Sequence, residues 1–217
     1  MIAGTIKAES IDEAIRLIET GTADLYELRV DALKSPEGIE KLAPFSERLI
    51  ITVRSKEEGG FREIDDEERL MLFKELMDIK PAFVDVEFKS SIVRDVIELA
   101  GKMGVGIIVS YHGFEGTPPS FERLKALLDE MRELKGDIIK IVTFAEHYID
   151  NIRVVRLYEY EKNLIAFCMG EKGKISRVFS LVLSPFTYAS LGEAAAPGQL
   201  SVEEMRLLSE MIGGGDD

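Results

Sequence analysis

Eight short apolar runs, separated by amphipathic stretches, are the feature of this 217-residue sequence that most limits its fold. The runs are rich in β-branched residues, and continuous runs of this kind are typical of parallel strands buried on both faces. The predicted strands span Ile2–Ile6, Leu25–Val30, Leu49–Val53, Phe83–Phe88, Gly106–Tyr111, Asp137–Thr143, Leu164–Met169 and, with the weakest pattern, Ser184–Ala189.

The stretches between these runs carry apolar residues at helical spacing, so each strand is expected to be followed by a helix or a helix-like segment. Clear examples are predicted over Asp66–Met77, Phe121–Leu134 and Tyr148–Tyr160. Eight strand–helix units in about 200 residues predict an α/β fold, a compact (β/α)8 TIM barrel, with a doubly wound open sheet as the alternative. We expect one barrel domain over residues 1–212 and a flexible C-terminal tail over residues 213–217.

The charge of the chain argues against two classes of partner. Lys and Arg total 27 and Asp and Glu total 40, which gives a formal net charge of −13 at pH 7. Because no long basic run offsets this charge, we expect no nucleic-acid partner and no binding to an anionic membrane surface. An anionic substrate would have to meet positive charge that the site itself supplies.

Cysteine usage and the opening residues bear on location. The one cysteine, Cys168, cannot form an internal disulfide, and the sequence opens without the pattern of a secretory signal. No apolar run approaches the roughly 20 residues of a membrane span, so we expect a cytoplasmic protein. The few side-chain amides, the absence of Trp and the abundance of Glu, Lys and Arg are typical of a heat-adapted protein.

Charged residues alternate with apolar residues in several predicted strands. In the second strand, Glu27, Arg29 and Asp31 share one face, and the opposite apolar face belongs against the helices. The charged face is therefore expected to line the barrel interior. The same pattern recurs in the next three strands, at Thr52 and Arg54, at Asp85 and Glu87, and at Ser110 and His112. Barrel enzymes place their chemistry at the C-terminal ends of the strands, although a purely structural ion network would show the same pattern.

Lys140 is the most unusual of these residues, because it interrupts the apolar sixth strand. A buried lysine is costly unless it is paired or neutral, and burial and nearby cations lower the pKa of such an amine. The neutral amine is a nucleophile that forms a Schiff base with a ketone or an aldehyde. His112 lies on the preceding strand and is suited to carry protons near neutral pH. Each residue alone also fits a structural role, but together they predict Schiff-base chemistry.

Eight short motifs occur in one order along nearly the whole chain. They read ELRVD at 27–31, TVRSKEEGG at 52–60, DVEF at 85–88, SYHGF at 110–114, KI at 140–141, MGEKGKISR at 169–177, SPFTYA at 184–189 and AAPGQ at 195–199. This set resembles type I 3-dehydroquinate dehydratase, a Schiff-base enzyme of the shikimate pathway. The resemblance implies a (β/α)8 barrel that dehydrates the small molecule 3-dehydroquinate to 3-dehydroshikimate with no metal or cofactor. It also implies a possible homodimer, since members of the family are often dimers.

The resemblance implies roles for individual residues as well. Lys140 matches the Schiff-base lysine, His112 the general acid/base and Glu58 the glutamate that assists the histidine. The substrate-binding positions of the family are matched by Glu27, Arg29, Arg54, Arg177, Gln199, Met169 and Tyr188. Within that set the resemblance assigns the substrate carboxylate to Arg177, substrate hydroxyls to Gln199 in a closing loop, and the cavity wall to the last two residues.

The chain departs from the family pattern at three places. Ala195 stands where many members have serine, Phe167 stands where methionine is common, and the first strand begins without the N-terminal hairpin of many members. Two other functions remain as alternatives. A class I aldolase is also a Schiff-base barrel, but it would not explain the His112 motif together with the AAPGQ loop. A binding barrel without turnover is supported only by Ala195.

Overall fold

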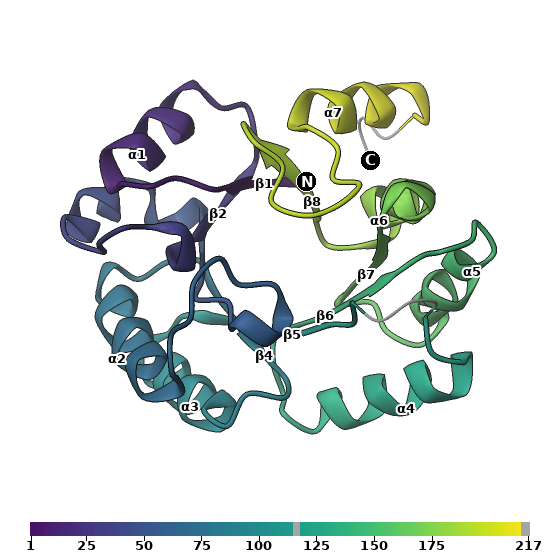
Figure 1. Ribbon diagram of the computed structural model, residues 1–217, viewed down its shortest axis with the longest axis horizontal. Coiled ribbons are helices and arrows are strands. Elements are labelled where there is room, and N and C mark those ends of the chain that lie inside the picture. Colours follow the sequence, from purple (N-terminus) through teal and green to yellow (C-terminus); the bar gives the residue numbers. More distant parts are fainter. Residues whose placement is uncertain (115–117, 214–217) are drawn as a thin grey trace.

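The computed structural model describes residues 1–114 and 118–213, and its eight parallel strands form a nearly closed barrel (Figure 1). The strands are β1 (Ile2–Ile6), β2 (Leu25–Arg29), β3 (Leu49–Thr52), β4 (Phe83–Glu87), β5 (Gly106–His112), β6 (Ile138–Phe144), β7 (Leu164–Met169) and β8 (Thr187–Leu191). They are hydrogen-bonded in the order β7-β6-β5-β4-β3-β2-β1-β8. Within the described residues, no hydrogen-bonded ladder joins β7 to β8, so these two strands flank the one seam.

The helices surround this sheet on the outside (Figure 1). They are α1 (Ile11–Thr20), α2 (Asp66–Leu76), α3 (Val93–Met103), α4 (Phe121–Arg132), α5 (Asp150–Val155), α6 (Lys174–Leu183) and α7 (Val202–Met211). The predicted TIM barrel is confirmed and the open doubly wound sheet is wrong, because β1 pairs with both β2 and β8. All eight strands join one sheet, which supports our proposal of a single domain over residues 1–212. From residue 214 onward the predicted tail lies outside the described residues.

Local sequence signals explain where the helices begin. Ser10, Asp65, Ser120 and Ser201 each cap a helix by accepting a hydrogen bond from the backbone N–H three residues later. The connection between β2 and β3 differs from the others, since it contains a 3-10 helix over Ile39–Arg48 instead of an α-helix. Pro44 lies inside that segment, and proline cannot donate the hydrogen bond that an α-helix needs there.

Most predicted boundaries are correct to within one or two residues, but two elements differ more. The eighth strand was predicted over Ser184–Ala189 and lies at Thr187–Leu191, because Ser184 ends α6 and Pro185 cannot donate to a strand ladder. The helix predicted over Tyr148–Tyr160 is shorter. Asp150 accepts backbone N–H bonds from residues 146 and 147 and so holds a turn before α5, and a 3-10 segment follows from residue 156.

The barrel interior is divided into an apolar half and a polar half. Near the N-terminal ends of the strands, the interior is filled by apolar side chains from several strands, among them Ile50, Ile108, Ile138, Ile165 and Phe186. A second, larger apolar core lies between the sheet and the helices. The charged side chains of the strands occupy the C-terminal half of the interior. The alternation of charged and apolar residues predicted that they line the interior. None of the helices in the described part of the chain has the length and apolar character that a bilayer crossing requires.

Candidate active site

A cavity opens at the C-terminal ends of the strands, where barrel enzymes hold their substrates. Its lining includes all ten residues that the sequence analysis singled out: Lys140, His112, Glu58, Glu27, Arg29, Arg54, Arg177, Gln199, Met169 and Tyr188. Six strands, β2, β3, β5, β6, β7 and β8, and the segments that follow them therefore converge on one site. His147, the second histidine of the chain, is exposed and does not line this cavity.

Lys140 is buried on β6, and its amine lies against two carboxylates. The Nζ atom is 3.0 Å from Oδ2 of Asp85 and 3.6 Å from Oε1 of Glu27. It also lies 3.8 Å from the centre of the Tyr188 ring, at the range of a cation–π contact. Of the two ways in which a buried lysine is tolerated, paired or neutral, the structure shows the paired one, because the direct partners of this amine are anions. The reason lies in the barrel closure, which brings the inward-facing carboxylates of β2 and β4 toward β6.

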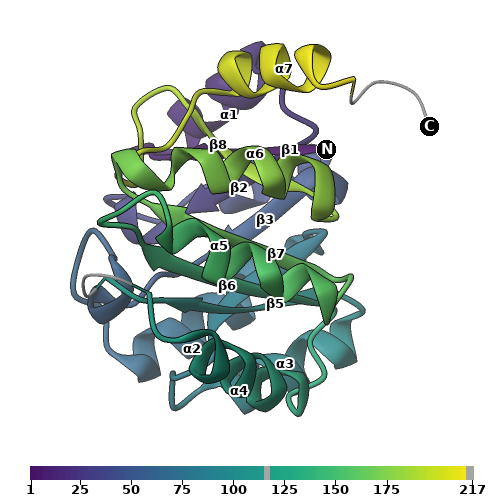
Figure 2. The same cartoon turned by 90° about the vertical axis from the view of Figure 1, so that its right-hand side faces the viewer.

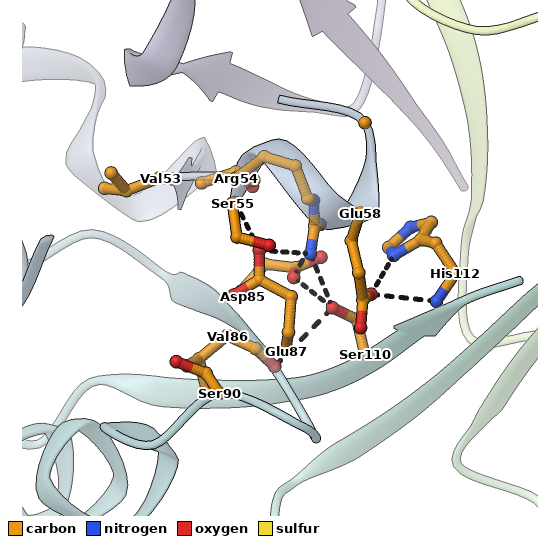
Figure 3. A network of polar contacts seen from close by, with 12 residues as sticks. Val53, Arg54, Ser55, Glu58, Asp85, Val86, Glu87, Ser90, Ser110 and His112 are labelled. Carbon is orange, nitrogen blue, oxygen red and sulfur yellow. Dashed lines mark hydrogen bonds and ion pairs between the residues drawn. The ribbon is translucent and has the colours of Figure 1, made fainter. Parts of the chain in front are cut away.

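His112 ends β5 and is held by Glu58. One carboxylate oxygen of Glu58, Oε2, is 2.9 Å from the backbone nitrogen of His112 and 3.0 Å from its Nδ1 (Figure 3). A proton on Nδ1 satisfies that contact and leaves Nε2 as the nitrogen available to a bound molecule. Glu58 reaches this position from a 3-10 turn over Lys56–Glu58, which ends at Gly59 with a φ of 89°, a value that favours glycine.

Burial changes the proton affinity of both partners. Burial, together with the positive charges of Arg54 and Lys140, lowers the pKa of His112 well below its usual value. Burial raises the pKa of Glu58 to about 7, against the opposing effect of the Arg54 charge. At neutral pH the imidazole is therefore a neutral base, while its carboxylate partner is close to its titration point.

Arg54 is fully engaged by the protein. Its guanidinium is 2.8 Å from Asp85, 3.2 Å from Glu87 and 2.8 Å from the Ser110 hydroxyl (Figure 3). Burial disfavours its charge, but the neighbouring carboxylates outweigh burial and raise the pKa of Arg54. A direct substrate contact by Arg54 would compete with these bonds, so the geometry favours a role in holding the carboxylates in place.

Arg29 and Asp31 form a similar internal pair beside the cavity. The Arg29 guanidinium donates to both carboxylate oxygens of Asp31, at 2.9 and 2.7 Å, and stacks 4.6 Å from the centre of the Phe61 ring. Asp31 also accepts the backbone N–H of Phe61 at 2.9 Å. This bidentate geometry fixes the guanidinium at the cavity edge.

Arg177 differs from the other two arginines of the cavity, Arg29 and Arg54, because no ion pair joins it to a carboxylate within the described residues. It lies on the buried side of α6, is 1% exposed, and stacks 4.3 Å from the centre of the Phe167 ring. Its Nε is buried without a hydrogen-bond partner. Burial lowers the pKa of Arg177 to about 10, which still leaves it charged at neutral pH. A buried, unpaired guanidinium in a cavity is a binding site for an anion, and a carboxylate matches its planar geometry.

Gln199 holds the loop after β8 over the cavity. Its Oε1 accepts the backbone N–H of Ala195 at 2.8 Å, and its Nε2 donates to the Thr5 hydroxyl at 3.2 Å. The Gly170 N–H donates to the carbonyl of Pro197, so the loop also bridges to the end of β7. A Cβ atom at Gly198 would come within 2.4 Å of the Gly170 carbonyl oxygen, which explains the glycine at this close approach.

Two residues of the site were not assigned by the sequence analysis. Asp85 was expected to face the barrel interior, but its contact with Lys140 was not foreseen. Thr5 lines the cavity and bonds Gln199, and it is the only polar residue of β1. Its position opposite Glu27 in the β1–β2 ladder is the signal that could have identified it.

Comparisons with known proteins agree with this geometry. The chain is 53% identical over 215 residues to a 3-dehydroquinate dehydratase of Pyrococcus abyssi, with 99% of this chain and 100% of that protein covered. The crystal structure of 3-dehydroquinate dehydratase from Aquifex aeolicus has a TM-score of 0.83 at 34% identity, covering 97% of this chain and 98% of that one. The enzyme from Geobacillus kaustophilus shares the fold, with a TM-score of 0.86 at 22% identity, over 100% of this chain and 92% of that one. The family model described as type I 3-dehydroquinase matches residues 2–216. The chain belongs to the type I 3-dehydroquinase family.

Proposed function

We propose that this protein is a lyase that dehydrates 3-dehydroquinate to 3-dehydroshikimate through a Schiff base on Lys140. The observation that carries the proposal is a single cavity with three parts: a buried amine, a neutral histidine base and an unpaired guanidinium. The amine suits a ketone, the histidine suits proton transfer at the neighbouring carbon, and the guanidinium suits a carboxylate. 3-Dehydroquinate carries all three partners.

The reaction needs only these side chains. The Lys140 amine adds to the ketone, and loss of water gives a protonated imine, which acts as an electron sink. His112 removes a proton from the adjacent carbon, and the resulting enamine expels the β-hydroxyl as that histidine returns a proton to the leaving oxygen. Hydrolysis of the imine then releases the product and regenerates the amine. One water molecule is lost overall, and no step requires a metal or cofactor.

The other site residues position the substrate and the two catalytic groups. Glu58 keeps the proton of His112 on Nδ1, so that Nε2 acts as the base. Arg177 binds the substrate carboxylate, and Gln199 exchanges one of its loop contacts for a substrate hydroxyl. Glu27, Arg29 and Arg54 form the polar wall, and Met169 and Tyr188 form the apolar wall. Ala195 offers no side-chain hydroxyl, so a backbone or water contact replaces it.

The dependence of turnover on pH tests this assignment. We expect kcat/KM for 3-dehydroquinate to rise with pH through about 7 and then to level off, because only ionised Glu58 accepts the Nδ1 proton. His112 contributes no limb near neutrality, because its lowered pKa leaves it unprotonated there. The rate is followed by the ultraviolet absorbance of the conjugated enone product.

The matched variant for this measurement is Glu58→Gln. It is expected to be slower than the wild type and to lack the limb near pH 7, since glutamine does not titrate. A wild-type profile that falls with rising pH through this range would contradict the assigned protonation states. The same assay separates the alternatives. A class I aldolase would cleave a carbon–carbon bond without forming the enone, and a binding barrel would bind the substrate without turning it over.

We also infer a homodimer, formed through the outer face of α6. This helix is inverted relative to a usual surface helix, because its buried positions include Ser176, Arg177 and Ser180, while its exposed positions are apolar. The exposed side chains are Ile175, Phe179, Val182 and Leu183, which are 45–62% exposed. An uninterrupted apolar stripe of this kind on a water-soluble surface is typical of an interface.

The neighbouring α5 enlarges this apolar face. Figure 2 shows α5 and α6 side by side on one side of the molecule, and Tyr148, Ile149 and Ile152 are exposed at and just before α5. The apolar face therefore extends over both helices.

Charge complementarity favours a second copy of the chain as the partner. Lys172 and Lys174 lie at the N-terminal end of α6, where the helix dipole is positive. Lys174 pairs with Glu171 at 2.8 Å, so this end keeps an excess of one positive charge, whereas the last turn has no basic residue. Antiparallel pairing of two α6 helices across a two-fold axis brings the lysines of one copy to the C-terminal end of the other. Each end of the helix then faces charge of the opposite sign.

The mass in solution tests this interface. The wild type is expected to elute with twice the monomer mass of 24.3 kDa in size exclusion with light scattering. Val182→Glu should dissociate it, because a charge in the middle of an apolar interface loses its hydration. Met71→Glu is the control, since Met71 is equally exposed (61%) but lies on α2. A monomeric wild type, or a Val182→Glu variant that stays dimeric, would refute this interface.

Two further expectations from the sequence remain predictions. The composition still predicts a heat-adapted protein. A cytoplasmic location stays a prediction, and the expectation of neither a nucleic-acid nor a membrane partner still rests on the charge balance.

A further inference from the structure

Asp85 occupies the position between the two main cations of the site. It lies on β4 and is 1% exposed. Its Oδ1 accepts hydrogen bonds from Arg54 at 2.8 Å and from the Ser110 hydroxyl at 2.6 Å, and its Oδ2 lies 3.0 Å from the Lys140 amine. One oxygen is therefore anchored by the scaffold, while the other is directed at the atom that forms the Schiff base.

The anchoring gives Asp85 a fixed orientation and a stable charge. Arg54, two residues after β3, and Ser110, on β5, hold the carboxylate in place, so its geometry does not depend on Lys140. Burial works against its ionisation, but the charges of Arg54 and Lys140 outweigh burial and lower the pKa of Asp85 below its usual range. Asp85 is thus a permanent anion and a poor proton acceptor at neutral pH.

We propose that Asp85 is a catalytic residue that serves as the fixed counter-ion of the imine nitrogen throughout the reaction. This inference rests on the proposed Schiff base at Lys140. The ammonium first gives up a proton, the neutral amine adds to the ketone, and the proton is taken up again as the adduct loses water; overall R–NH3⁺ + O=C → R–NH⁺=C + H2O, so the nitrogen carries one positive charge before and after imine formation. A carboxylate that pairs with the ammonium at 3.0 Å can therefore stay ionised and pair with the imine proton as well.

The counter-ion has a specific effect on the chemistry. The imine is an electron sink only while it is protonated, and a buried cation without a partner would lose its proton. A preorganised charge inside a water-poor cavity stabilises such a cation without having to reorganise. Asp85 thus keeps the imine protonated while His112 removes the proton from carbon.

Glu27 and Glu87 are less suited to this role. Glu27 is farther from the amine, at 3.6 Å, and one of its oxygens accepts the Thr52 hydroxyl at 3.0 Å. Glu87 is equally buried and lies on the same strand as Asp85, but it pairs with Arg54 and Arg69 and accepts the backbone N–H of Ser55. Its ion pairs do not include Lys140, which makes it the matched control for the loss of a buried charge.

The test compares Asp85→Asn with Glu87→Gln and the wild type. Each protein is mixed with 3-dehydroquinate, the reaction is stopped with borohydride at increasing times, and the reduced adduct on the Lys140 peptide is quantified by mass spectrometry. Asp85→Asn is expected to form the adduct about 100-fold more slowly and to lose kcat in the same proportion, the scale reported for removal of one preorganised electrostatic group. KM should change little. Glu87→Gln should form the adduct much faster than Asp85→Asn.

A second variant, Asp85→Ala, keeps the test valid if the asparagine side chain of Asp85→Asn does not fit the site. In Asp85→Ala, added formate should restore adduct formation, whereas neutral formamide should not, a difference that a purely structural role would not produce. Thermal unfolding of every variant is measured alongside. The proposal is overturned if Asp85→Asn forms the adduct at the wild-type rate, or if Glu87→Gln is slowed to the same extent. If the wild type itself forms no adduct, the proposed function and this inference both fail. If the wild type forms the adduct and only the comparison of the variants fails, the proposed function stands and this inference alone is overturned.

Discussion

Replacement of Lys140 by alanine is expected to lower kcat for 3-dehydroquinate by at least about 10⁴-fold, the scale on which removal of a covalent nucleophile acts. The proposed route begins with the amine of Lys140, and no other lysine lines the cavity in the described part of the chain. Without the amine, no imine forms and the carbon next to the ketone is no longer acidified. Initial rates of enone formation measure the effect.

The control for this variant is Lys102→Ala. Lys102 lies on α3 and forms an exposed pair with Glu98, so its loss should leave kcat unchanged. Lys140→Ala should still bind the substrate, since the guanidinium of Arg177 is intact. Turnover of Lys140→Ala within a few-fold of the wild type would refute covalent catalysis by this residue.

Replacement of Arg177 by alanine is expected to raise KM by roughly 10–150-fold, because a charge-assisted hydrogen bond contributes about 1.5–3 kcal/mol. The guanidinium is buried without an anionic partner in the described residues, so a bound carboxylate would supply its missing partner. Loss of this contact weakens binding of the substrate before any chemistry occurs. Steady-state kinetics with 3-dehydroquinate separate KM from kcat.

Arg177→Lys is the informative companion. Lysine keeps the positive charge but lacks the planar pair of donors, so its KM should lie between those of the wild type and the alanine variant. An unchanged KM in Arg177→Ala would place the substrate carboxylate elsewhere in the cavity. Arg29 would then be the next candidate, because it also lines the cavity.

The strand pattern of the sequence was sufficient to predict the barrel. Runs of β-branched residues mark seven strands closely, because strands buried on both faces have to be apolar. The eighth was misplaced because Ser184 and Pro185 read as part of an apolar run, although Ser184 ends α6. The length of α5 was overestimated. The helix begins where the Asp150 carboxylate accepts two backbone N–H groups, and hydrophobic spacing gives no sign of such hydrogen bonds.

The site was predicted in part by alternation. Charged residues at every second strand position identified the polar interior, and Lys140 and His112 proved to lie on neighbouring strands. The Asp85–Lys140 pair was not foreseen, because β4 and β6 are separated by β5 and only the curvature of the barrel brings them together.

The inward orientation of Arg177 could not be predicted from hydrophobic spacing. Its helix carries a regular apolar stripe, and hydrophobic spacing alone would place that stripe against the barrel. In the structure the stripe faces outward and the serines and Arg177 face inward. Only the resemblance to the family identified this residue, since the inversion depends on tertiary contacts such as the bond from the Cys168 N–H to the Ser176 hydroxyl.

The most direct test of the central claim is borohydride reduction in the presence of 3-dehydroquinate, followed by digestion and mass spectrometry of the peptides. The account predicts a stable adduct of the substrate or product on the peptide that contains Lys140, and no adduct in Lys140→Ala. A folded wild-type barrel that yields no adduct, or an adduct on another lysine, would contradict the proposed Schiff base and with it the assignment of the site.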